Sequence, residues 1–223
     1  MITEKVRSFF SKYPVTAYKR EEIILRPDDP VPYVYYVVSG FVRMYCLLPD
    51  GKELTLNIFK PDTYFPVFLI LGNSANTYYY QTITPVQLKR TPKAEVLTFL
   101  QREPDVLFDF TSRISVGVNG LLSNIQYLLF GPASGRVASV LLILSRRFGV
   151  KKDSAITIQL PLTHQDIANL IGLTRETTSL EMEKLVARKI ISYDHKQVII
   201  HSAVVLAREV VLESAAGTDE VSL

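Results

Sequence analysis

Residues 15 to about 92 carry short β-branched and aromatic runs in which apolar and polar positions alternate. Turn-forming residues interrupt these runs, as at Ser39-Gly40 and Asp50-Gly51. Because Asp-Gly supplies the positive φ that a tight turn needs, we expect a hairpin at the second of these breaks. The pattern predicts an antiparallel sandwich or roll. We interpret the apolar run at 67–71 as a buried strand of that domain.

From about Pro92 the hydrophobic period changes to that of a helix. The segment 93–104 predicts a short helix, and we expect a longer one from about Asp105 to Phe130. Apolar residues at heptad-compatible spacings mark one face of the long helix: Leu107, Phe110, Ile114, Leu121 and Leu128. The candidate dimer interface on this helix comprises Phe110, Ile114, Leu121, Ile125 and Leu128. Such a face packs either on the helix's own β domain or on the same helix of a second copy, and the pattern does not choose between the two.

Gly131-Pro132 breaks the long helix, so we place a hinge there. The next helix is expected to end at Gly149, followed by a polar loop at 151–154 and a short strand within 156–162. Two helices and the strand KQVII (196–200) follow, and the tail from Ala203 begins as a helix and becomes polar.

A helix-turn-helix pattern lies between residues 163 and 187. Thr163, with Asp166 three residues later, predicts a capped helix start, and Gly172 predicts its end. Thr174 can cap the second helix. The small side chain of Ala168 lets another helix approach closely. The same pattern also occurs in plain helical hairpins.

The second helix of this pair, TRETTSLEMEKL, has one face that is hard to bury. Thr178, Met182 and Leu185 share the face that a core would cover. Leu180 lies on the opposite, polar side with Arg175. A leucine on the solvent side of a short polar helix calls for a partner on that side.

Composition adds a few limits. The chain has 223 residues, 48% of them hydrophobic, and a net charge of +3, which permits a nucleic-acid partner without arguing for one. Residues 132–202 hold ten Lys and Arg against six Asp and Glu, a local net charge of +4. Cys46 is the only cysteine, which excludes an internal disulfide and fits a reducing, cytoplasmic setting. No apolar run is long enough to span a bilayer.

The segment LTHQDIANLIGLTRETTSLEMEKLVARKIIS strongly resembles the C-terminal winged helix of the CRP/FNR family of bacterial transcription regulators. The resemblance extends from about residue 15 to 202. VVSGFVRMY, the hairpin at Asp50-Gly51 and GPASGRVASVLLIL resemble the family's sensor domain, hinge and first C-terminal helix. Arg175-Glu176-Thr177 matches the Arg-Glu-Thr that begins the family's recognition helix.

The resemblance implies an α+β fold in which a double-stranded β-helix, similar to a jelly roll, precedes a long dimerisation helix and a winged helix-turn-helix. The corresponding ranges are a sensor domain over 1–104, the dimerisation helix and hinge over 105–131, the DNA-binding domain over 132–202, and a C-terminal helix and polar tail over 203–223. It favours a homodimer held by the apolar face of the long helix. It implies three partners: double-stranded DNA, a second copy of the chain and RNA polymerase.

The resemblance also identifies the residues expected to meet DNA: Thr163, Gln165, Thr174, Arg175, Glu176, Thr177, Ser179 and Leu180. Arg175 is placed for a bidentate contact to a guanine edge, and Glu176 can accept from a cytosine amino group. Ser179 can reach a base or a phosphate. Leu180 departs from the family, because many members carry a second arginine there. Leucine packs on a thymine methyl group instead, so we expect A·T at that step.

The sensor domain lacks the residues with which relatives hold a cyclic nucleotide. Pro66-Val67 stands where a Gly-Glu pair is expected, and Asn76-Thr77 stands where Arg-Ser is expected. We therefore expect an effector other than cyclic AMP. An aromatic-rich set is either core packing or a pocket for an apolar or aromatic effector: Tyr64, Phe65, Phe68, Asn76, Tyr78 and Tyr80.

We expect neither a catalytic site nor a metal or cofactor. The glycines of GPASGR lack the Lys-Ser/Thr of a phosphate loop, and no nucleophile elbow or HExxH motif is present. His164 is a first-turn residue with nothing to activate. The alternative function is an effector-binding β roll that acts through protein contacts, with weak or no DNA binding, and the departure at Leu180 keeps it open.

Overall fold

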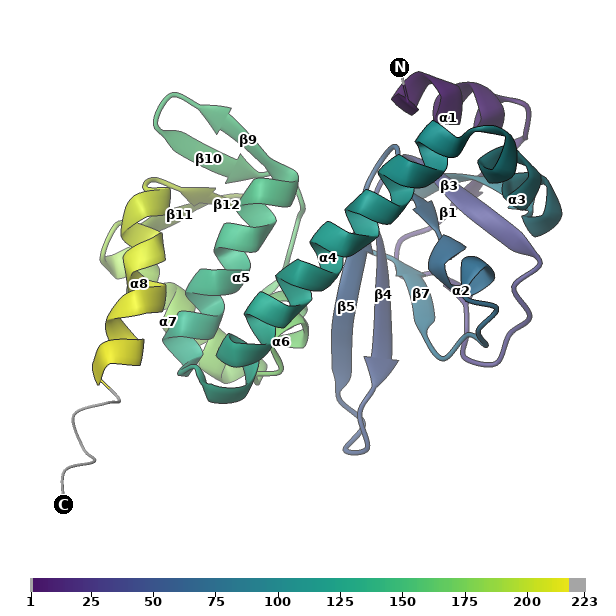
Figure 1. Ribbon diagram of the computed structural model, residues 1–223. Helices are drawn as coiled ribbons and strands as arrows, with labels where there is room; N and C mark the ends of the chain where they lie inside the picture. The colour runs from purple at the N-terminus through teal and green to yellow at the C-terminus, as the bar shows by residue number, and fades with distance from the viewer. Residues whose placement is uncertain (1, 217–223) are drawn as a thin grey trace. The chain divides into compact units, whose positions relative to one another are not determined.

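The computed structural model describes residues 2–216, without the side chains of residues 120–130 and 211–216 (Figure 1). The chain forms two compact units, the first ending at Val118 and the second beginning at Asn119. Each mixes helices with antiparallel sheet, so the α+β prediction is confirmed. Among the described residues no helix is both long and apolar enough to cross a membrane.

Two four-stranded antiparallel sheets form the body of the first unit, in the orders β1-β8-β3-β6 and β2-β7-β4-β5. Their strands are β1 (Val15–Tyr18), β2 (Ile23–Leu25), β3 (Tyr33–Ser39), β4 (Val42–Leu47), β5 (Glu53–Phe59), β6 (Tyr64–Phe65), β7 (Tyr79–Thr82) and β8 (Val86–Pro92). Strands distant in sequence are neighbours in both sheets, as expected for the predicted roll.

Alternation along β3 gives the roll two hydrophobic layers. Tyr35 and Val37 point into the core of the roll, where β8 contributes Leu88. Val34 and Tyr36 point the other way, into a second cluster covered by helices. Because successive side chains of a strand face opposite sides, one strand can serve both layers.

The predicted hairpin at Asp50-Gly51 joins β4 to β5. Gly51 has φ +81°, and its N–H donates to the carbonyl of Leu48 at 2.9 Å. Gly40, which ends β3, has φ +82°, and a Cβ there would lie 2.3 Å from the carbonyl oxygen of Pro85. Both breaks in the hydrophobic pattern are therefore real turns, and at Gly40 only glycine fits.

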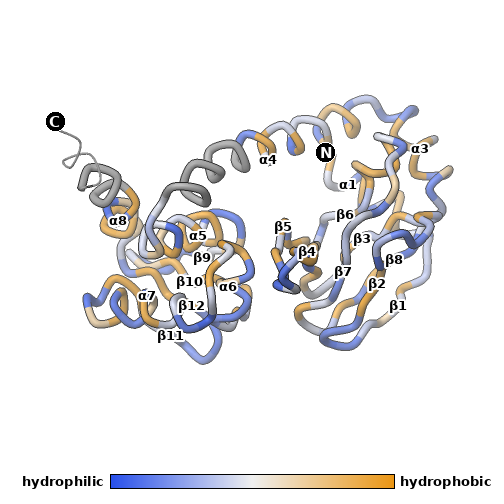
Figure 2. The backbone as a smooth tube through the Cα atoms, turned by 90° about the horizontal axis from the view of Figure 1, so that it is seen from below, coloured by the Kyte–Doolittle hydropathy of each residue, from blue (hydrophilic) through white to orange (hydrophobic). Residues whose placement is uncertain are grey.

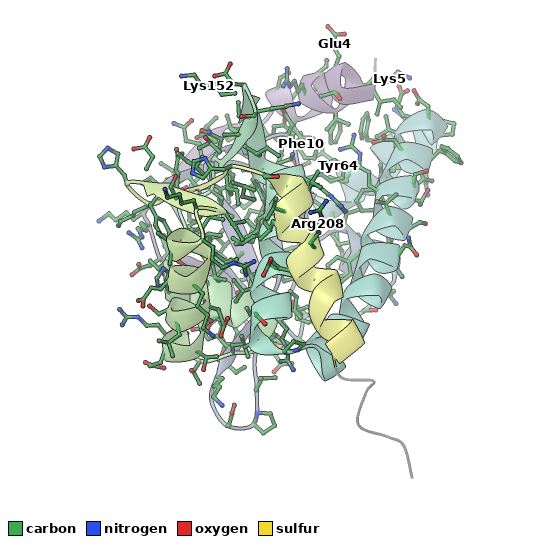
Figure 3. The ribbon with its side chains drawn as sticks, turned by 90° about the vertical axis from the view of Figure 1, so that its left-hand side faces the viewer. Glu4, Lys5, Phe10, Tyr64, Lys152 and Arg208 are labelled. Atoms are coloured by element: carbon green, nitrogen blue, oxygen red, sulfur yellow. The ribbon has the colours of Figure 1, made fainter. Side chains whose placement is uncertain are left out.

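The second cluster is covered by α1 (Ile2–Ser11), α3 (Lys93–Arg102) and the start of α4 (Pro104–Phe130). The sequence pattern assigned no element to α1, which the structure adds. Its residues Val6 and Phe10, four apart, are buried on one face. Phe10 stacks on Tyr36 at a centroid distance of 4.7 Å and lies 5.7 Å from the ring of Tyr64 (Figure 3).

Ion pairs attach α1 to two other parts of the first unit. Lys5 bonds to Glu103 at 2.7 Å and to Asp105 at 2.8 Å, next to the start of α4. Arg7 donates to both carboxylate oxygens of Asp62. The Arg7 guanidinium holds the pKa of Asp62 below its usual value. Burial of α1 is thus decided by tertiary contacts, which explains why periodicity alone missed it.

The expectation of a buried strand at 67–71 is wrong, because this run forms the helix α2 (Val67–Leu71). Val67 and Leu69 are buried, whereas Phe68 and Leu71 are exposed, at 38% and 42%. A short continuous apolar run has no period that separates a strand from a helical turn. Here the run leaves the sheet directly after β6, where the N–H groups of Leu69 and Ile70 bond to the carbonyl of Pro66.

The second unit packs four helices around a small sheet (Figure 1). Its elements are α5 (Ala133–Phe148), β9 (Gly149–Lys152), β10 (Ala155–Ile158), α6 (His164–Ile171), α7 (Arg175–Ala187), β11 (Ile191–Asp194), β12 (Gln197–Ile200) and α8 (Ala203–Ala216). The sheet order is β11-β12-β10-β9. Leu141, Ile167, Met182 and Leu206 are fully buried, one from each helix.

The polar loop expected at 151–154 is also wrong in part, since Lys151 and Lys152 belong to β9. β9 pairs with β10 in a hairpin whose turn is Asp153-Ser154, with Asp153 at φ +55°. Aspartate tolerates this left-handed conformation, so the turn can be tight. A polar edge strand resembles a loop in sequence because its side chains, such as that of Lys152, stay in solvent (Figure 3).

Candidate DNA-binding site and sensor domain

The helix-turn-helix of the second unit has caps at both of its helix starts and at the turn. Thr163 accepts from the Asp166 N–H at 3.2 Å, and its own N–H donates to the Asp166 carboxylate at 2.8 Å. Gly172 ends α6 in the left-handed region, at φ +65°. The Thr174 hydroxyl accepts from the Thr177 N–H at 3.2 Å and begins α7. All three predicted end signals are confirmed, which fixes the angle between the helices.

The buried face of α7 is the predicted one. Thr178 and Met182 are fully buried, and Leu185 is 6% exposed. The buried Thr178 hydroxyl costs little because it donates to the carbonyl of Thr174 at 2.9 Å. Leu180 is 59% exposed on the other side. The described residues of the domain therefore leave most of this leucine uncovered.

The first turn of α7 presents two charged side chains to solvent. Arg175 and Glu176 are exposed, and neither forms a hydrogen bond or ion pair with any described residue. An unpaired guanidinium beside an unpaired carboxylate offers donors and acceptors together at a helix N-terminus. This is the arrangement that direct reading of base edges requires.

Four other predicted DNA-binding residues already have hydrogen-bond partners within the domain. The hydroxyl groups of Thr174 and Thr177 lie 2.9 Å apart. The Thr163 hydroxyl donates to Asp166 at 2.6 Å, and the Gln165 amide donates to Asn169 at 2.7 Å. These four side chains are thus oriented before any ligand arrives.

The predicted wing is the hairpin of β11 and β12, with His195 in its turn at φ +52°. Its Tyr193 hydroxyl lies 2.9 Å from Nε2 of His164, whose Nδ1 lies 3.0 Å from the Ser179 hydroxyl. The sequence interpretation gave no role to His164 or Tyr193. The two are far apart in the chain, and no local pattern marks a contact that only the packing of the wing on α6 creates.

The long helix α4 begins as part of the first unit. Val106 is fully buried, and Leu107 and Phe110 pack against the second cluster of the β roll. Further along, Ile114 is 37% exposed, Val116 74% and Val118 48%. The first turns of α4 therefore pack on their own β domain. Packing on the β domain was one of the two alternatives that the sequence left open for this helix, the other being packing on a second copy. Figure 2 shows hydrophobic positions interspersed with hydrophilic ones along the coloured part of α4. Three predicted interface residues, Leu121, Ile125 and Leu128, lie outside the described side chains.

The side chains of the candidate effector residues do not all point to the same side of the β roll. Tyr64 points out of the roll and stacks on Phe110 at 5.4 Å. Its neighbour Phe65 points inward and stacks on Tyr80 at 5.1 Å and 6°. Phe65 and Tyr80 thus fill the roll core as packing, the other interpretation of this set. The Tyr80 hydroxyl is nevertheless buried without a hydrogen-bond partner among the described residues, and burial raises its pKa well above the usual value.

The segment from α2 to β7 contains the positions at which the resemblance leads us to expect the family's cyclic-nucleotide ligands. Val67 is buried, and Asn76 is 2% exposed. The Asn76 amide donates to the carbonyls of Arg26 and Tyr78, at 2.6 Å and 2.9 Å. The Asn76 side chain is therefore used to hold the backbone at Arg26 and Tyr78. Tyr78 is half-buried and lies 6.3 Å from the ring of Phe68.

Arg43 is one arginine of the roll that a phosphate would need as a replacement ligand, but its side chain is engaged elsewhere. Its guanidinium pairs with Glu53 at 2.6 Å, donates to Gln81, and lies 4.2 Å from the centre of the Tyr45 ring. Cys46, further along the same strand, is half-buried and unpaired. Breaking the three Arg43 contacts would offset much of what a phosphate contact contributes.

A β roll joined by a long helix to a capped helix-turn-helix with a wing defines a DNA-binding regulator with a separate sensor domain. Two family models match, the cyclic nucleotide-binding domain over residues 15–103 and the Crp-like helix-turn-helix domain over residues 135–209. The chain belongs to the CRP/FNR family of transcription regulators.

Two curated relatives illustrate the match. The global nitrogen regulator of Nostoc sp. is 32% identical, over 87% of this chain and 88% of the relative. The CRP-like cAMP-activated global transcriptional regulator of Mycobacterium tuberculosis is 27% identical, over 86% and 85%.

Two solved structures have the same fold. A CooA mutant from Carboxydothermus hydrogenoformans has a TM-score of 0.75 at 21% identity, covering 90% of this chain and 89% of that one. FixK2 from Bradyrhizobium japonicum has a TM-score of 0.75 at 23% identity, covering 88% and 96%. At this identity the likeness concerns the fold alone.

Proposed function

We propose that this regulator binds an inverted-repeat operator as a homodimer and reads each half-site with the first turns of α7. The observation that carries the proposal is the first turn of α7, where Arg175 and Glu176 are exposed and form no hydrogen bond or ion pair with the described residues. Leu180, 59% exposed, fits beside them against a thymine methyl group. On this proposal, the exposed leucine faces the DNA.

The homodimer is proposed to form along α4 beyond Phe110. At about 100° per residue, Ile114 and Val118 share one face of the helix with the predicted positions 121, 125 and 128. Exposed apolar side chains at 37% and 48% favour a partner helix on that face. A twofold dimer would place two recognition helices about one helical turn of DNA apart, so the operator is expected to be palindromic.

The effector is proposed to be something other than cyclic AMP. Ionised phosphate needs a cation, and the residues at 66–67 and 76–77 supply none. The roll core is instead apolar and aromatic. The Tyr80 hydroxyl, which has no hydrogen-bond partner among the described residues, is a group that one polar atom of an effector would satisfy. As a regulator of transcription, the protein is further proposed to contact RNA polymerase.

Selection of bound sequences from random duplex DNA, using the purified full chain, tests this proposal. The expected result is one enriched inverted repeat whose affinity falls steeply with salt. A native mass spectrum of the same preparation would detect a co-purified effector. Absence of any enriched motif would instead favour the alternative, an effector-binding roll that acts through protein contacts.

A further inference from the structure

Three elements of the second unit meet at the imidazole of His164, the first residue of α6. Nδ1 lies 3.0 Å from the Ser179 hydroxyl oxygen on α7, and Nε2 lies 2.9 Å from the Tyr193 hydroxyl oxygen on β11. Ser179 also reaches Glu183, one turn further along α7, at 3.3 Å. The four side chains form one continuous chain of hydrogen bonds.

The donor and acceptor of every hydrogen bond in this series follow from Glu183, the residue at its end. A carboxylate only accepts, so Ser179 donates its single proton to Glu183. Ser179 must then accept from His164, which places the imidazole proton on Nδ1. In the neutral ring Nε2 is left with a lone pair, which accepts from Tyr193. Burial raises the pKa of Tyr193 to about 12, so its hydroxyl keeps the proton that it donates.

This order leaves Ser179 with one unused lone pair and no free proton. We propose that the chain from Tyr193 through His164 to Glu183 makes Ser179 an acceptor only, so that the base it reads must present an amino group. In the major groove adenine N6 and cytosine N4 carry such a group, whereas guanine and thymine present acceptors at the corresponding edge. His164 is then a positioning residue for base specificity.

The inference rests on the proposed function, in which α7 reads the half-site. It goes further by stating which bases Ser179 accepts and why. A serine hydroxyl that is free to rotate tolerates donors and acceptors alike. Glu183 on α7 takes the serine proton and His164 on α6 occupies one lone pair, which removes that freedom. The specificity of one base position therefore depends on residues that need not touch DNA.

Selection from random DNA with a set of variants tests the inference. Ser179→Ala identifies the position that Ser179 reads, because preference there is lost. In the wild type that position should favour adenine or cytosine by roughly 3- to 10-fold, as expected for one hydrogen bond. Glu183→Ala frees the serine proton, so guanine and thymine should be accepted there as well. Glu183→Gln removes the same charge but keeps an accepting oxygen, and should retain most of the preference.

His164→Leu removes the donor that holds the Ser179 oxygen but leaves Glu183 to accept the serine proton, so the position should still reject guanine and thymine while its preference for adenine or cytosine weakens. Tyr193→Phe removes the donor to Nε2 and should likewise leave guanine and thymine excluded. The preference at the position read by Arg175 should stay unchanged in all of these variants, and circular dichroism melting confirms that each is folded. An unchanged preference in Glu183→Ala overturns the inference, as does a wild-type preference for guanine or thymine. A wild type that enriches no motif at all overturns the proposed function instead.

Discussion

Arg175 is the side chain on which sequence reading by α7 depends most, because its guanidinium is exposed and unpaired among the described residues. Arg175→Ala should cost about 1–3 kcal/mol of binding free energy on the selected operator and relax preference at one base pair. Arg146→Ala, which removes an exposed charge from the last turn of α5, is the matched control and should alter no base preference. An unchanged motif after Arg175→Ala would mean that α7 is not the reader.

Leu180 is the residue at which this chain departs from its family. Leu180→Arg should shift preference from A·T toward G·C at a neighbouring base pair, because arginine donates to guanine and leucine contacts a thymine methyl group. The added charge should also steepen the dependence of affinity on salt. Leu180→Met keeps an apolar contact and should keep the wild-type motif. Both effects are read from operator binding at several salt concentrations.

At the scale of elements, the turn between α6 and α7 depends on the backbone of Gly172. Its φ of +65° disfavours any residue with a Cβ, although the space around it is open. Gly172→Ala should lower the free energy of unfolding by about 1–2 kcal/mol, since strain and not a clash opposes it. Asparagine adopts this conformation more readily, so Gly172→Asn should cost less. Urea unfolding followed by circular dichroism measures both, and equal losses would contradict this origin.

At the scale of the whole molecule, the proposed dimer depends on one face of α4. Ile114→Glu should place like charges across the twofold axis and produce monomers that bind operator poorly. Val116→Glu introduces the same charge at a residue that is 74% exposed, on another face of the helix, and should leave the dimer intact. Analytical ultracentrifugation separates these outcomes. A dimeric Ile114→Glu protein would show that the interface lies elsewhere.

The sensor domain gives a second prediction at this scale. Isothermal titration of the full chain with cyclic AMP should show no binding at micromolar concentrations, because Val67 and Asn76 occupy the positions of the family's ligands. Arg43, held by Glu53, is not free to compensate. A cyclic AMP-activated relative titrated in the same buffer is the positive control. Micromolar affinity would contradict the proposal, and loss of that affinity in Arg43→Ala would explain it.

The sequence by itself determined the parts of this protein that depend on neighbouring residues. The caps at Thr163 and Thr174, the left-handed Gly172 and the hairpin at Gly51 all follow from local backbone chemistry. The buried face of α7 follows from periodicity. The family resemblance then gave the order of the domains, and the structure has the strands and helices in that order.

Only the tertiary structure decided the elements whose stability comes from distant partners. Helix α1 is held by Asp62, Glu103 and Asp105, none of which its own sequence reveals. The run at 67–71 became a helix because of where it leaves the sheet. His164 gained its partners when the wing packed beside α6 and α7. Hydrogen bonds between residues 15 and 29 positions apart leave no periodic trace, so sequence reading placed Ser179 on the exposed face but could not assign the direction of its proton.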